Sequence, residues 1–218
     1  MPSISIKNKM LLNGDDVKNK LKEFGISGIL NSVINADCLD IMRLMPDKCV
    51  DLVLTDPPYG LGRTVSKGSH GFGKGKSTKY EDSWDVLPTK EYFDEIIRIS
   101  KNQIIFGGNY MAHLVFPSRC WLVWDKKGTA AFSNPFSDCE LLWTSFPKVI
   151  KKYTFMHQGA ITKSKDKIVH PTQKPSELIQ QILQDWSEKG NLIFDPFLGS
   201  GTTAVAAKQL SRKYIGIE

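Results

Sequence analysis

The sequence predicts an α/β fold in which a mainly parallel, doubly wound sheet of about seven strands is covered by helices on both faces. Short apolar, β-branched or aromatic runs recur between turn residues, which is typical of buried strands. Segments with helical periodicity lie between several of these runs. In sheets of this kind, ligands bind at the carboxyl ends of the strands, near the point where the strand order reverses.

The predicted elements follow in chain order. The strands are Ser32–Asn35, Val50–Leu54, Ile104–Phe106, Trp121–Trp124, Glu140–Trp143, Leu192–Phe194 and Tyr214–Ile217. The clearest helix starts after Pro175, because proline is favoured at the start of a helix and apolar residues then recur with helical spacing. These apolar residues are Leu178, Ile179, Ile182, Leu183 and Trp186.

Composition is that of a globular protein. With 218 residues, 41% hydrophobic and 24% charged, the chain can bury one core, so we expect a single domain over residues 1–218. No apolar stretch approaches the roughly 20 residues that cross a bilayer, which predicts a cytoplasmic protein without a membrane partner. The cysteines form no C-x-x-C pair and the histidines no H-E-x-x-H motif, so no metal site is expected. The formal charge of +6 suits a polyanionic partner without establishing one.

Two regions break the alternation of strands and helices. Residues 60–79 are rich in glycine and lysine and contain almost nothing able to pack, which predicts a mobile basic loop. Such a loop could follow a phosphate backbone or be a solvated linker. Residues 125–169 mix strand-like and basic pieces without a helical period.

The first motif with chemical potential is Asp56-Pro57-Pro58-Tyr59, directly after the predicted strand Val50–Leu54. A proline-stiffened turn is the plain structural interpretation, since both Asp and Pro are common in turns. Chance would place this tetrapeptide in roughly one chain in a thousand of this length. Its rarity and its position at the carboxyl end of a strand favour a functional role.

The motif suits methylation of an amino group on a base. The amino nitrogen of adenine or cytosine is a poor nucleophile because its lone pair is delocalised into the ring. The Asp56 carboxylate and the Pro57 carbonyl can accept its two hydrogens and favour the pyramidal geometry of attack. Pro57 and Pro58 restrict the turn, so these acceptors are preorganised. Tyr59 offers a ring on which a flipped base can stack.

The second motif reads DPFLGSGTT from Asp195 to Thr203, between the predicted strand Leu192–Phe194 and a helical segment. A glycine-rich turn of this kind lets the backbone approach a ligand closely. It lacks both G-x-G-x-x-G and G-K-[ST], so a nucleotide-like ligand without a pyrophosphate fits best. One strand later comes Glu218, at the place where a doubly wound fold binds ribose hydroxyls.

Together these residues resemble the amino-group DNA methyltransferases of the permuted β class, in which DPPY precedes DPFLGSGT. The resemblance covers nearly the whole chain and is strongest to small phage-type members. It implies a Rossmann-like class I methyltransferase fold, a sheet of about seven strands with one antiparallel, and S-adenosyl-L-methionine as cofactor. It also implies double- or single-stranded DNA as partner, makes residues 125–169 a candidate target-recognition region, and allows a homodimer, since relatives often dimerise.

The resemblance also implies roles for single residues. Asp37 and Cys38 match the segment that touches the cofactor's adenine, Glu218 matches the acid that binds its ribose, and the block from His170 to Pro175 matches the motif that closes over its methionine end. The predicted catalytic residues are Asp56, Pro57, Pro58 and Tyr59. The predicted cofactor-binding residues are Asp37, Cys38, Asp56, His170, Thr172, Lys174, Asp195, Phe197, Gly199, Ser200, Gly201, Thr202 and Glu218.

Three further stretches resemble small phage-type members and are expected to line strand ends bordering the flipped base: Phe106–Asn109, Trp124–Lys126, and Phe132–Ser133 through Cys139–Trp143. Packing is the better explanation for Trp124 and Trp143, so none of these stretches joins the catalytic set.

The cysteines and the residue before Pro57 indicate which atom of the base is methylated. None of the cysteines follows a proline, which argues against carbon-5 cytosine methylation because that reaction needs a cysteine nucleophile. Asp56 before Pro-Pro-Tyr, where cytosine enzymes often have Ser, resembles the adenine enzymes, so the N6 amino group of adenine is the expected target. N4-cytosine methylation, an RNA or protein methyltransferase, and a non-catalytic DNA-binding relative are the alternatives.

Overall fold

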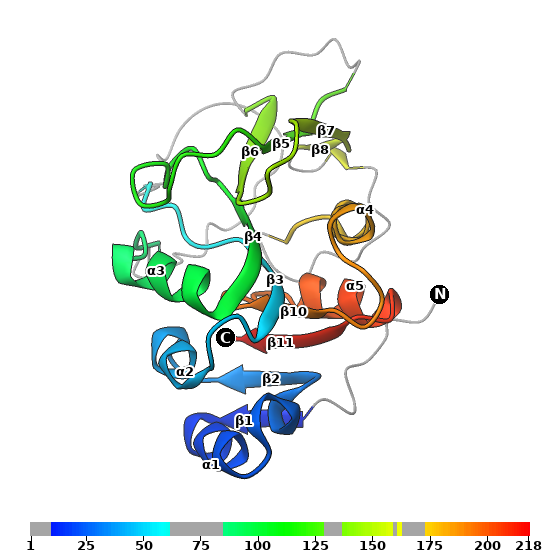
Figure 1. The fold of residues 1–218 in the computed structure, drawn as a ribbon. Helices are drawn as coiled ribbons and strands as arrows, with labels where there is room; N and C mark the ends of the chain where they lie inside the picture. The colour runs from blue at the N-terminus through cyan, green and yellow to red at the C-terminus, as the bar shows by residue number, and fades with distance from the viewer. Residues whose placement is uncertain (1–9, 62–84, 129–136, 159–160, 163–172) are drawn as a thin grey trace, which may run out of the picture.

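The structure is a computed structural model that describes residues 10–61, 85–128, 137–158, 161–162 and 173–218. Within these residues a nine-stranded sheet has the order β1-β2-β11-β10-β3-β4-β6-β5-β7, and β8 and β9 form a separate pair (Figure 1). The strands are β1 Met10–Asn13, β2 Ser32–Asn35, β3 Val50–Thr55, β4 Ser100–Phe106, β5 Trp121–Asp125, β6 Cys139–Thr144, β7 Lys151–Thr154, β8 His157–Gln158, β9 Ile161–Thr162, β10 Leu192–Asp195 and β11 Lys213–Ile217.

Neighbouring strands of the large sheet are parallel except at β6, which runs antiparallel to both β4 and β5. The expectations of a mainly parallel sheet and of one antiparallel strand are confirmed within the described residues. All seven predicted strands are present, as β2, β3, β4, β5, β6, β10 and β11.

The expected number of strands was too low, because β1 and β7 extend the sheet at its two edges. Edge strands pair on one side only, and they carry exposed or charged side chains that discourage further pairing. Leu11 of β1 is 68% exposed, and β7 contributes only Tyr153 to the interior beside Lys151 and Lys152. β7 therefore lacks the continuous apolar run that marks the central strands, whereas β1 has a short one, Met10–Leu12, that was not predicted as a strand.

Helices cover both faces of the sheet, as a doubly wound fold requires (Figure 1). One face carries α1, α2 and α3, and the other carries α4 and α5, so the chain has two hydrophobic cores. The predicted apolar face of α4 is confirmed, because its five apolar residues are all buried. The helices are α1 Gly14–Phe24, α2 Cys38–Leu44, α3 Lys90–Ile99, α4 Ser176–Trp186 and α5 Thr202–Gln209, with a 3₁₀ turn, η1, at Gly25–Ile29.

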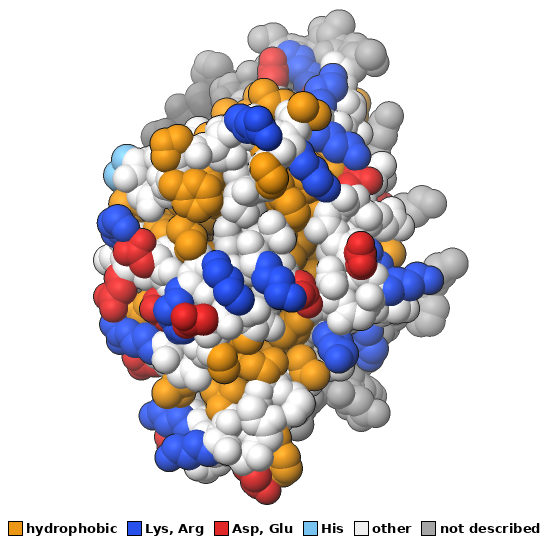
Figure 2. All heavy atoms as spheres, viewed as in Figure 1, with side chains coloured by type: hydrophobic (Ala, Val, Ile, Leu, Met, Phe, Trp, Pro, Cys, Tyr) orange, Lys and Arg blue, Asp and Glu red, His pale blue; other side chains and the backbone are white. Residues whose placement is uncertain are grey.

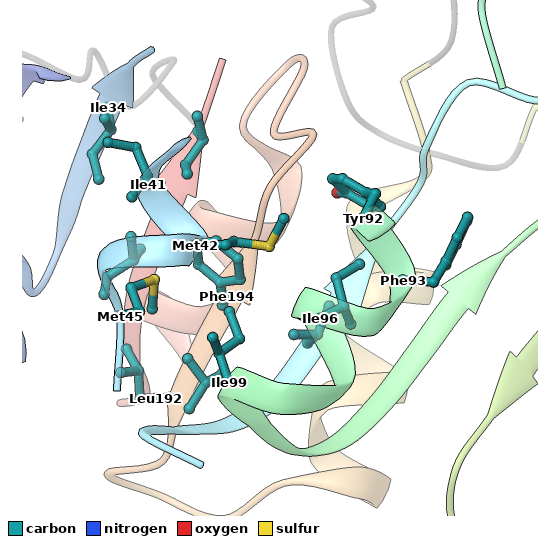
Figure 3. Close-up of a cluster of buried hydrophobic side chains, with 14 of the residues drawn as sticks. Ile34, Ile41, Met42, Met45, Tyr92, Phe93, Ile96, Ile99, Leu192 and Phe194 are labelled. Carbon is teal, nitrogen blue, oxygen red and sulfur yellow. The ribbon is translucent and has the colours of Figure 1, made fainter. Parts of the chain in front are cut away.

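The core under α2 and α3 packs against one face of the central strands. Figure 3 shows side chains of both helices meeting Phe194 of β10 and Ile34 of β2. Tyr92, Phe93, Ile96 and Ile99 of α3 are all buried because they share one face of an amphipathic helix.

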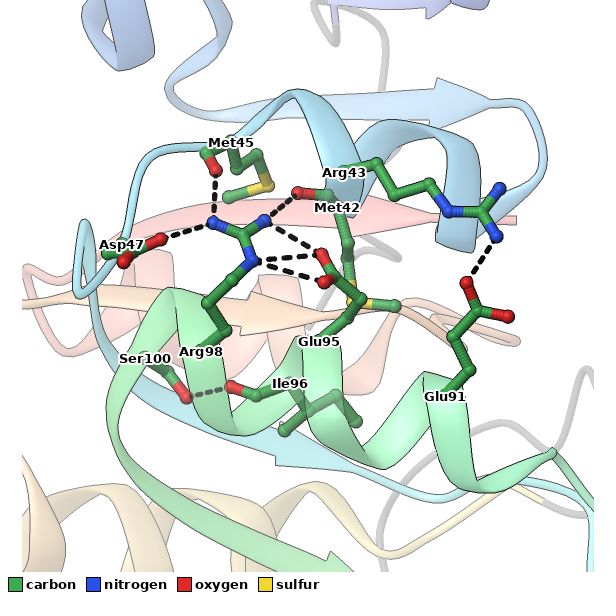
Figure 4. Close-up of polar contacts among 9 residues, drawn as sticks. All are labelled: Met42, Arg43, Met45, Asp47, Glu91, Glu95, Ile96, Arg98 and Ser100. Atoms are coloured by element: carbon green, nitrogen blue, oxygen red, sulfur yellow. Dashed lines mark hydrogen bonds and ion pairs between the residues drawn. The ribbon is translucent and has the colours of Figure 1, made fainter.

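Arg98 locks α3 to the end of α2 (Figure 4). Its guanidinium donates to the carbonyl oxygens of Met42 and Met45 over 2.7 and 2.9 Å, and to Glu95 and Asp47. The Met42 carbonyl also accepts from the Met45 amide, so Arg98 adds a second donor to it and supplies one to the Met45 carbonyl at the end of α2. It fixes α2, whose first turn carries two of the predicted cofactor residues.

The two irregular regions are described only in part. Of residues 60–79, the structure describes Gly60 and Leu61, and the expected basic loop otherwise lies outside the described residues. Of residues 125–169, β6 and β7 belong to the central sheet, while 129–136, 159–160 and 163–169 lie outside the described residues.

Candidate active site

The strand order reverses between β10 and β3. The chain continues from β10 to β11 on one side and from β3 to β4 on the other, so the ends of β10 and β3 flank the switch point. Phe194 pairs with Val53 across these two strands, which places Asp195 and Asp56 at the same edge of the sheet. The fold therefore brings the two sequence motifs together.

Both carboxylate oxygens of Asp56 are engaged. The Tyr59 hydroxyl donates to Oδ1 over 2.7 Å, and the Lys174 ammonium is bonded to Oδ2. The Asp56 side chain is 24% exposed and that of Lys174 is 14% exposed, so water screens the pair weakly. Asp56 is thus a carboxylate held in one orientation by a neutral donor and a cation.

Lys174 stands between two carboxylates. Its Nζ lies 3.9 Å from Oε2 of Glu140 and 5.3 Å from the centre of the Phe106 ring. Burial alone would lower the pKa of Lys174, but Asp56 and Glu140 together outweigh that effect and raise it. The second oxygen of Glu140, Oε1, accepts from Lys126 over 3.0 Å. Two cations and two anions therefore alternate beside the switch point.

The Tyr59 ring is held by its surroundings. It stacks on Tyr110, with ring centroids 5.0 Å apart and planes inclined by 25°. Gly107 has φ +65°, and a Cβ there would come within 2.3 Å of the ring. Burial, and then the charge of Asp56, raise the pKa of Tyr59 well above its ordinary value, so the hydroxyl remains a donor to Asp56.

Asp85 holds the turn that follows the motif. Its Oδ1 accepts from the backbone amides of Tyr59 and Gly60 over 3.1 and 2.9 Å. Pro57 is buried and, like Pro58, provides no amide hydrogen, so Asp85 satisfies the first two donors after the prolines.

The loop after β10 bends sharply into α5. Gly199 has φ +51° and Gly201 has φ +82°, both in the left-handed region that glycine tolerates best. Gly201 is the N-cap of α5 and supplies no side-chain cap, while the Ser200 and Thr202 hydroxyls lie 2.9 Å apart. The first amides of α5 therefore face the loop without a side-chain cap, an arrangement that suits a polar ligand.

Asp195 is the buried acid of this loop. It is 4% exposed, and its Oδ1 accepts from the Phe197 amide over 3.2 Å. Burial raises its pKa to about 7, although Thr203 and the Phe197 amide act in the opposite direction.

The predicted ribose acid lies against the glycine loop. Oε2 of Glu218 accepts from the Gly199 amide over 2.6 Å, and the Glu218 amide donates to the carbonyl of Ile34 in β2. Asp37 follows β2 and caps α2 by accepting from the amides of Leu39 and Asp40. Asp37 therefore has a structural role that is independent of any ligand.

Tyr92 of α3 connects the two halves of the predicted cofactor site. Its ring lies 4.9 Å from that of Phe197, and its hydroxyl lies beside the Cys38 thiol. Tyr92 is 4% exposed, and its hydroxyl oxygen makes no hydrogen bond within the described part of the chain. Burial raises the pKa of Cys38 to about 11, so this thiol is protonated. A buried polar atom without a partner marks a place where a ligand can bind.

The sequence of this chain matches a known protein family over about two thirds of its length. The N6_N4_Mtase family, described as DNA methylase, matches residues 74–218. The chain belongs to this DNA methylase family. The match contains the glycine loop and Lys174 and begins after Tyr59.

Individual methyltransferases are also similar to this chain in sequence or in fold. The type II methyltransferase M.HinfI of Haemophilus influenzae is 27% identical over 244 residues, which cover 88% of this chain and 66% of that protein. Among solved structures, the cytosine-N4-specific PvuII DNA methyltransferase aligns with a TM-score of 0.58 and 16% identity, covering 86% of this chain and 81% of that one. The M1.HpyAVI-SAM complex aligns with a TM-score of 0.54 and 22% identity, covering 85% and 92%. These likenesses confirm the expected methyltransferase fold.

Most of the predicted site residues of this methylase lie at one edge of the sheet. Asp56 and Tyr59 are joined by a hydrogen bond, and Lys174 joins them from the segment before α4. On the cofactor side, Glu218 meets Gly199, and Cys38 meets Phe197 through Tyr92. His170 and Thr172 lie outside the described residues.

Sequence reasoning missed several residues that the structure places at the candidate site. Tyr92 resembled an ordinary apolar position of an amphipathic helix, and Tyr110 and Asp85 lie in loops without a motif. Glu140 was noted only as part of the stretch Cys139–Trp143. Its one usable signal was an acid placed at the start of a strand that is otherwise apolar.

The described residues hold no group of three or more metal-ligating side chains. Among the described helices, none is long and apolar enough to span a bilayer.

Proposed function

We propose that this methylase transfers a methyl group from S-adenosyl-L-methionine to the N6 amino group of an adenine flipped out of DNA. The observation that carries the proposal is the place of Asp56, an oriented carboxylate at the switch point of the sheet, beside the glycine loop of the other motif. An amine whose hydrogen is accepted by this carboxylate becomes more nucleophilic as it pyramidalises, and the growing positive charge on nitrogen is stabilised. The base has to leave the duplex, because its amine is inaccessible inside the stack.

The glycine loop and its neighbours fit the cofactor. S-adenosyl-L-methionine supplies, when bound, a methyl group on a positively charged sulfur. Phe197 and Tyr92 offer apolar rings for an adenosine group, the buried Tyr92 hydroxyl makes no hydrogen bond within the described residues, and the Glu218 carboxylate suits ribose hydroxyls. Close approach of the backbone is possible at Gly199, where no atom of the described residues would meet a Cβ within 4 Å.

The choice of adenine rests on the residue before Pro57. Asp56, as opposed to Ser, resembles the adenine enzymes, and its full charge gives the stronger acceptor. N4-cytosine methylation is the second candidate, because both amines need the same acceptors and PvuII DNA methyltransferase is cytosine-N4-specific.

Charge supports a nucleic-acid partner. The chain carries a formal charge of +6, and Figure 2 shows Lys and Arg side chains spread over the visible face, several of them at the end formed by β5, β6 and β7. Residues 60–79 are proposed as the basic loop that follows the phosphates, and the parts of 125–169 outside the central sheet as the target-recognition region.

The test is product identification. The purified protein is incubated with isotopically labelled S-adenosyl-L-methionine and unmethylated genomic DNA, and the nucleosides are separated and identified by mass spectrometry. Labelled N6-methyladenine is expected, with Asp56→Asn as the matched control that yields almost none. Labelled N4-methylcytosine would move the target to cytosine. Label found only in RNA or protein added in parallel would place the chain in another substrate class.

A further inference from the structure

Four charged side chains form a line that ends at the proposed catalytic carboxylate. They come from separate segments: Lys126 follows β5, Glu140 lies in β6, Lys174 precedes α4, and Asp56 follows β3. Lys126 pairs with Glu140 at 3.0 Å, and Lys174 pairs with Asp56 and lies 3.9 Å from Glu140. All four side chains are less than a quarter exposed, so their interactions are only weakly screened.

Glu140 holds an unused acceptor that faces the lysine. Its Oε2 is buried and makes no hydrogen bond within the described part of the chain. A buried acceptor without a hydrogen bond is unfavourable, and such groups mark places where something binds or moves. The Lys174 ammonium lies 3.9 Å from this oxygen and needs to move by only about 1 Å to form a hydrogen bond of ordinary length.

Asp56, in contrast, has no free oxygen. Tyr59 holds Oδ1 and Lys174 holds Oδ2. The reaction proposed above needs Asp56 to accept a hydrogen from the target amine. A lysine cation on the same carboxylate also opposes the positive charge that develops on that nitrogen, since like charges repel strongly where water is scarce.

We propose that Lys174 moves from Asp56 to Glu140 when the target amine binds, so that Oδ2 of Asp56 becomes the acceptor for the amine. Glu140 is a positioning residue in this scheme, because it acts through Lys174 and does not touch the base. Lys126 fixes the other oxygen of Glu140 and so keeps Oε2 directed at the lysine. The lysine moves from one carboxylate of the cluster to another, so the net charge of this weakly screened site does not change. The inference rests on the proposed methylation of a base amine.

A double-mutant cycle tests the exchange. Single-turnover methylation is measured at saturating cofactor and DNA for the wild type, Glu140→Gln, Lys174→Met and the double variant. Glu140→Gln keeps the shape but removes the charge that attracts the lysine, so the rate should fall by about 10- to 100-fold, the range found for directly coupled side chains. In the Lys174→Met background no lysine needs a second site, and Glu140→Gln should change the rate less than about twofold.

If Glu140→Gln lowered the rate equally in the wild type and in Lys174→Met, the proposal would be overturned, because Glu140 would then act independently of Lys174. An unchanged rate in Glu140→Gln would overturn it as well. Asp94→Asn is the matched control, since it removes an exposed carboxylate of α3 that pairs with Lys90 on the surface, outside the candidate site. Methylation by the wild type is the separate check on the proposed function, so a failure there is distinguishable from a failure of the exchange.

A structural measurement keeps the test decisive if Lys174→Met has no measurable rate. The wild type is crystallised with S-adenosyl-L-homocysteine and its DNA substrate. We expect the Lys174 ammonium within hydrogen-bond distance of Glu140 and the target amine on Asp56. A lysine that stays on Asp56 with the amine in place would refute the exchange.

Discussion

Gly107→Ala should damage the active site through a single added methyl group. Gly107 follows β4 with φ +65°, and a Cβ there would lie 2.3, 2.5 and 2.8 Å from three atoms of the Tyr59 ring. Ordinary contact to a Cβ begins near 3.4 Å. The ring therefore has to retreat by about 1 Å, because packed interiors have little free space to absorb the overlap. That movement displaces the hydroxyl that orients Asp56.

The stability of Gly107→Ala depends on two destabilising contributions and one stabilising contribution. An alanine in the left-handed region costs about 1–2 kcal/mol, and overpacking costs typically about 1–3 kcal/mol. Reduced freedom of the unfolded chain returns about 0.4–1 kcal/mol. The free energy of unfolding should fall by about 1–5 kcal/mol in total. A displacement of about 1 Å at a reacting centre costs on the order of 10²-fold in rate.

Gly190→Ala is the matched control. Gly190 also has positive φ, +84°, but a Cβ there meets nothing within 4 Å, so this variant carries the backbone strain without the clash. Urea unfolding gives the stability of both variants, and single-turnover methylation gives their rates. We expect Gly190→Ala to lose about 1 kcal/mol and keep its rate. A folded Gly107→Ala protein with a wild-type rate would refute the role assigned to the Tyr59 ring and hydroxyl.

Three further predictions concern the acids and the loop. Asp56→Asn should fold and bind cofactor but lose on the order of 10²–10³ in single-turnover rate, because an amide is a weaker acceptor than a carboxylate; near-normal turnover would contradict the mechanism. Gly199→Val should abolish cofactor binding in calorimetry, since φ is +51° and a β-branched residue is strained there; unchanged affinity in a folded variant would remove the loop from the cofactor site. Burial raises the pKa of Asp195 from 3.8 to about 7, so the folded state holds a proton that the unfolded chain releases, and this group makes the protein less stable as pH rises from about 4 to about 7. Asp195→Asn should remove that part of the pH dependence in urea unfolding, and an identical pH profile would show that the acid is not buried as described.

Local patterns were sufficient to predict the central fold. Buried parallel strands such as β3 and β10 are apolar on both faces, so their sequences stand out from their neighbours. The edge strand β7 carries no such pattern, because Tyr153 is its one buried residue, while the short apolar run Met10–Leu12 of β1 was not identified as a strand. Their pairing is decided by the sheet they extend, which no local run of residues reveals.

The site was predictable wherever backbone geometry restricts the residue type. Asp56 and its two prolines, and the glycines at 199 and 201, occupy positions whose chemistry or φ admits few alternatives. Tyr92 and Glu140 could not be assigned in this way. Each is an ordinary residue for its element, and only the packing of α3 against Phe197 and of β6 beside β4 brings it to the site.

The sequence alone determined the α/β class, the order of the two motifs, and the turn chemistry at Asp56 and in the glycine loop. Those features depend on residues close together in the chain, where steric limits on the backbone act directly. The tertiary structure decided which charged side chains lie next to one another. The segment before α4 meets β3 only after the sheet has formed, and that meeting places Lys174 between Asp56 and Glu140. Contacts between residues so distant in sequence are set by the packing of whole elements, which local propensity does not specify.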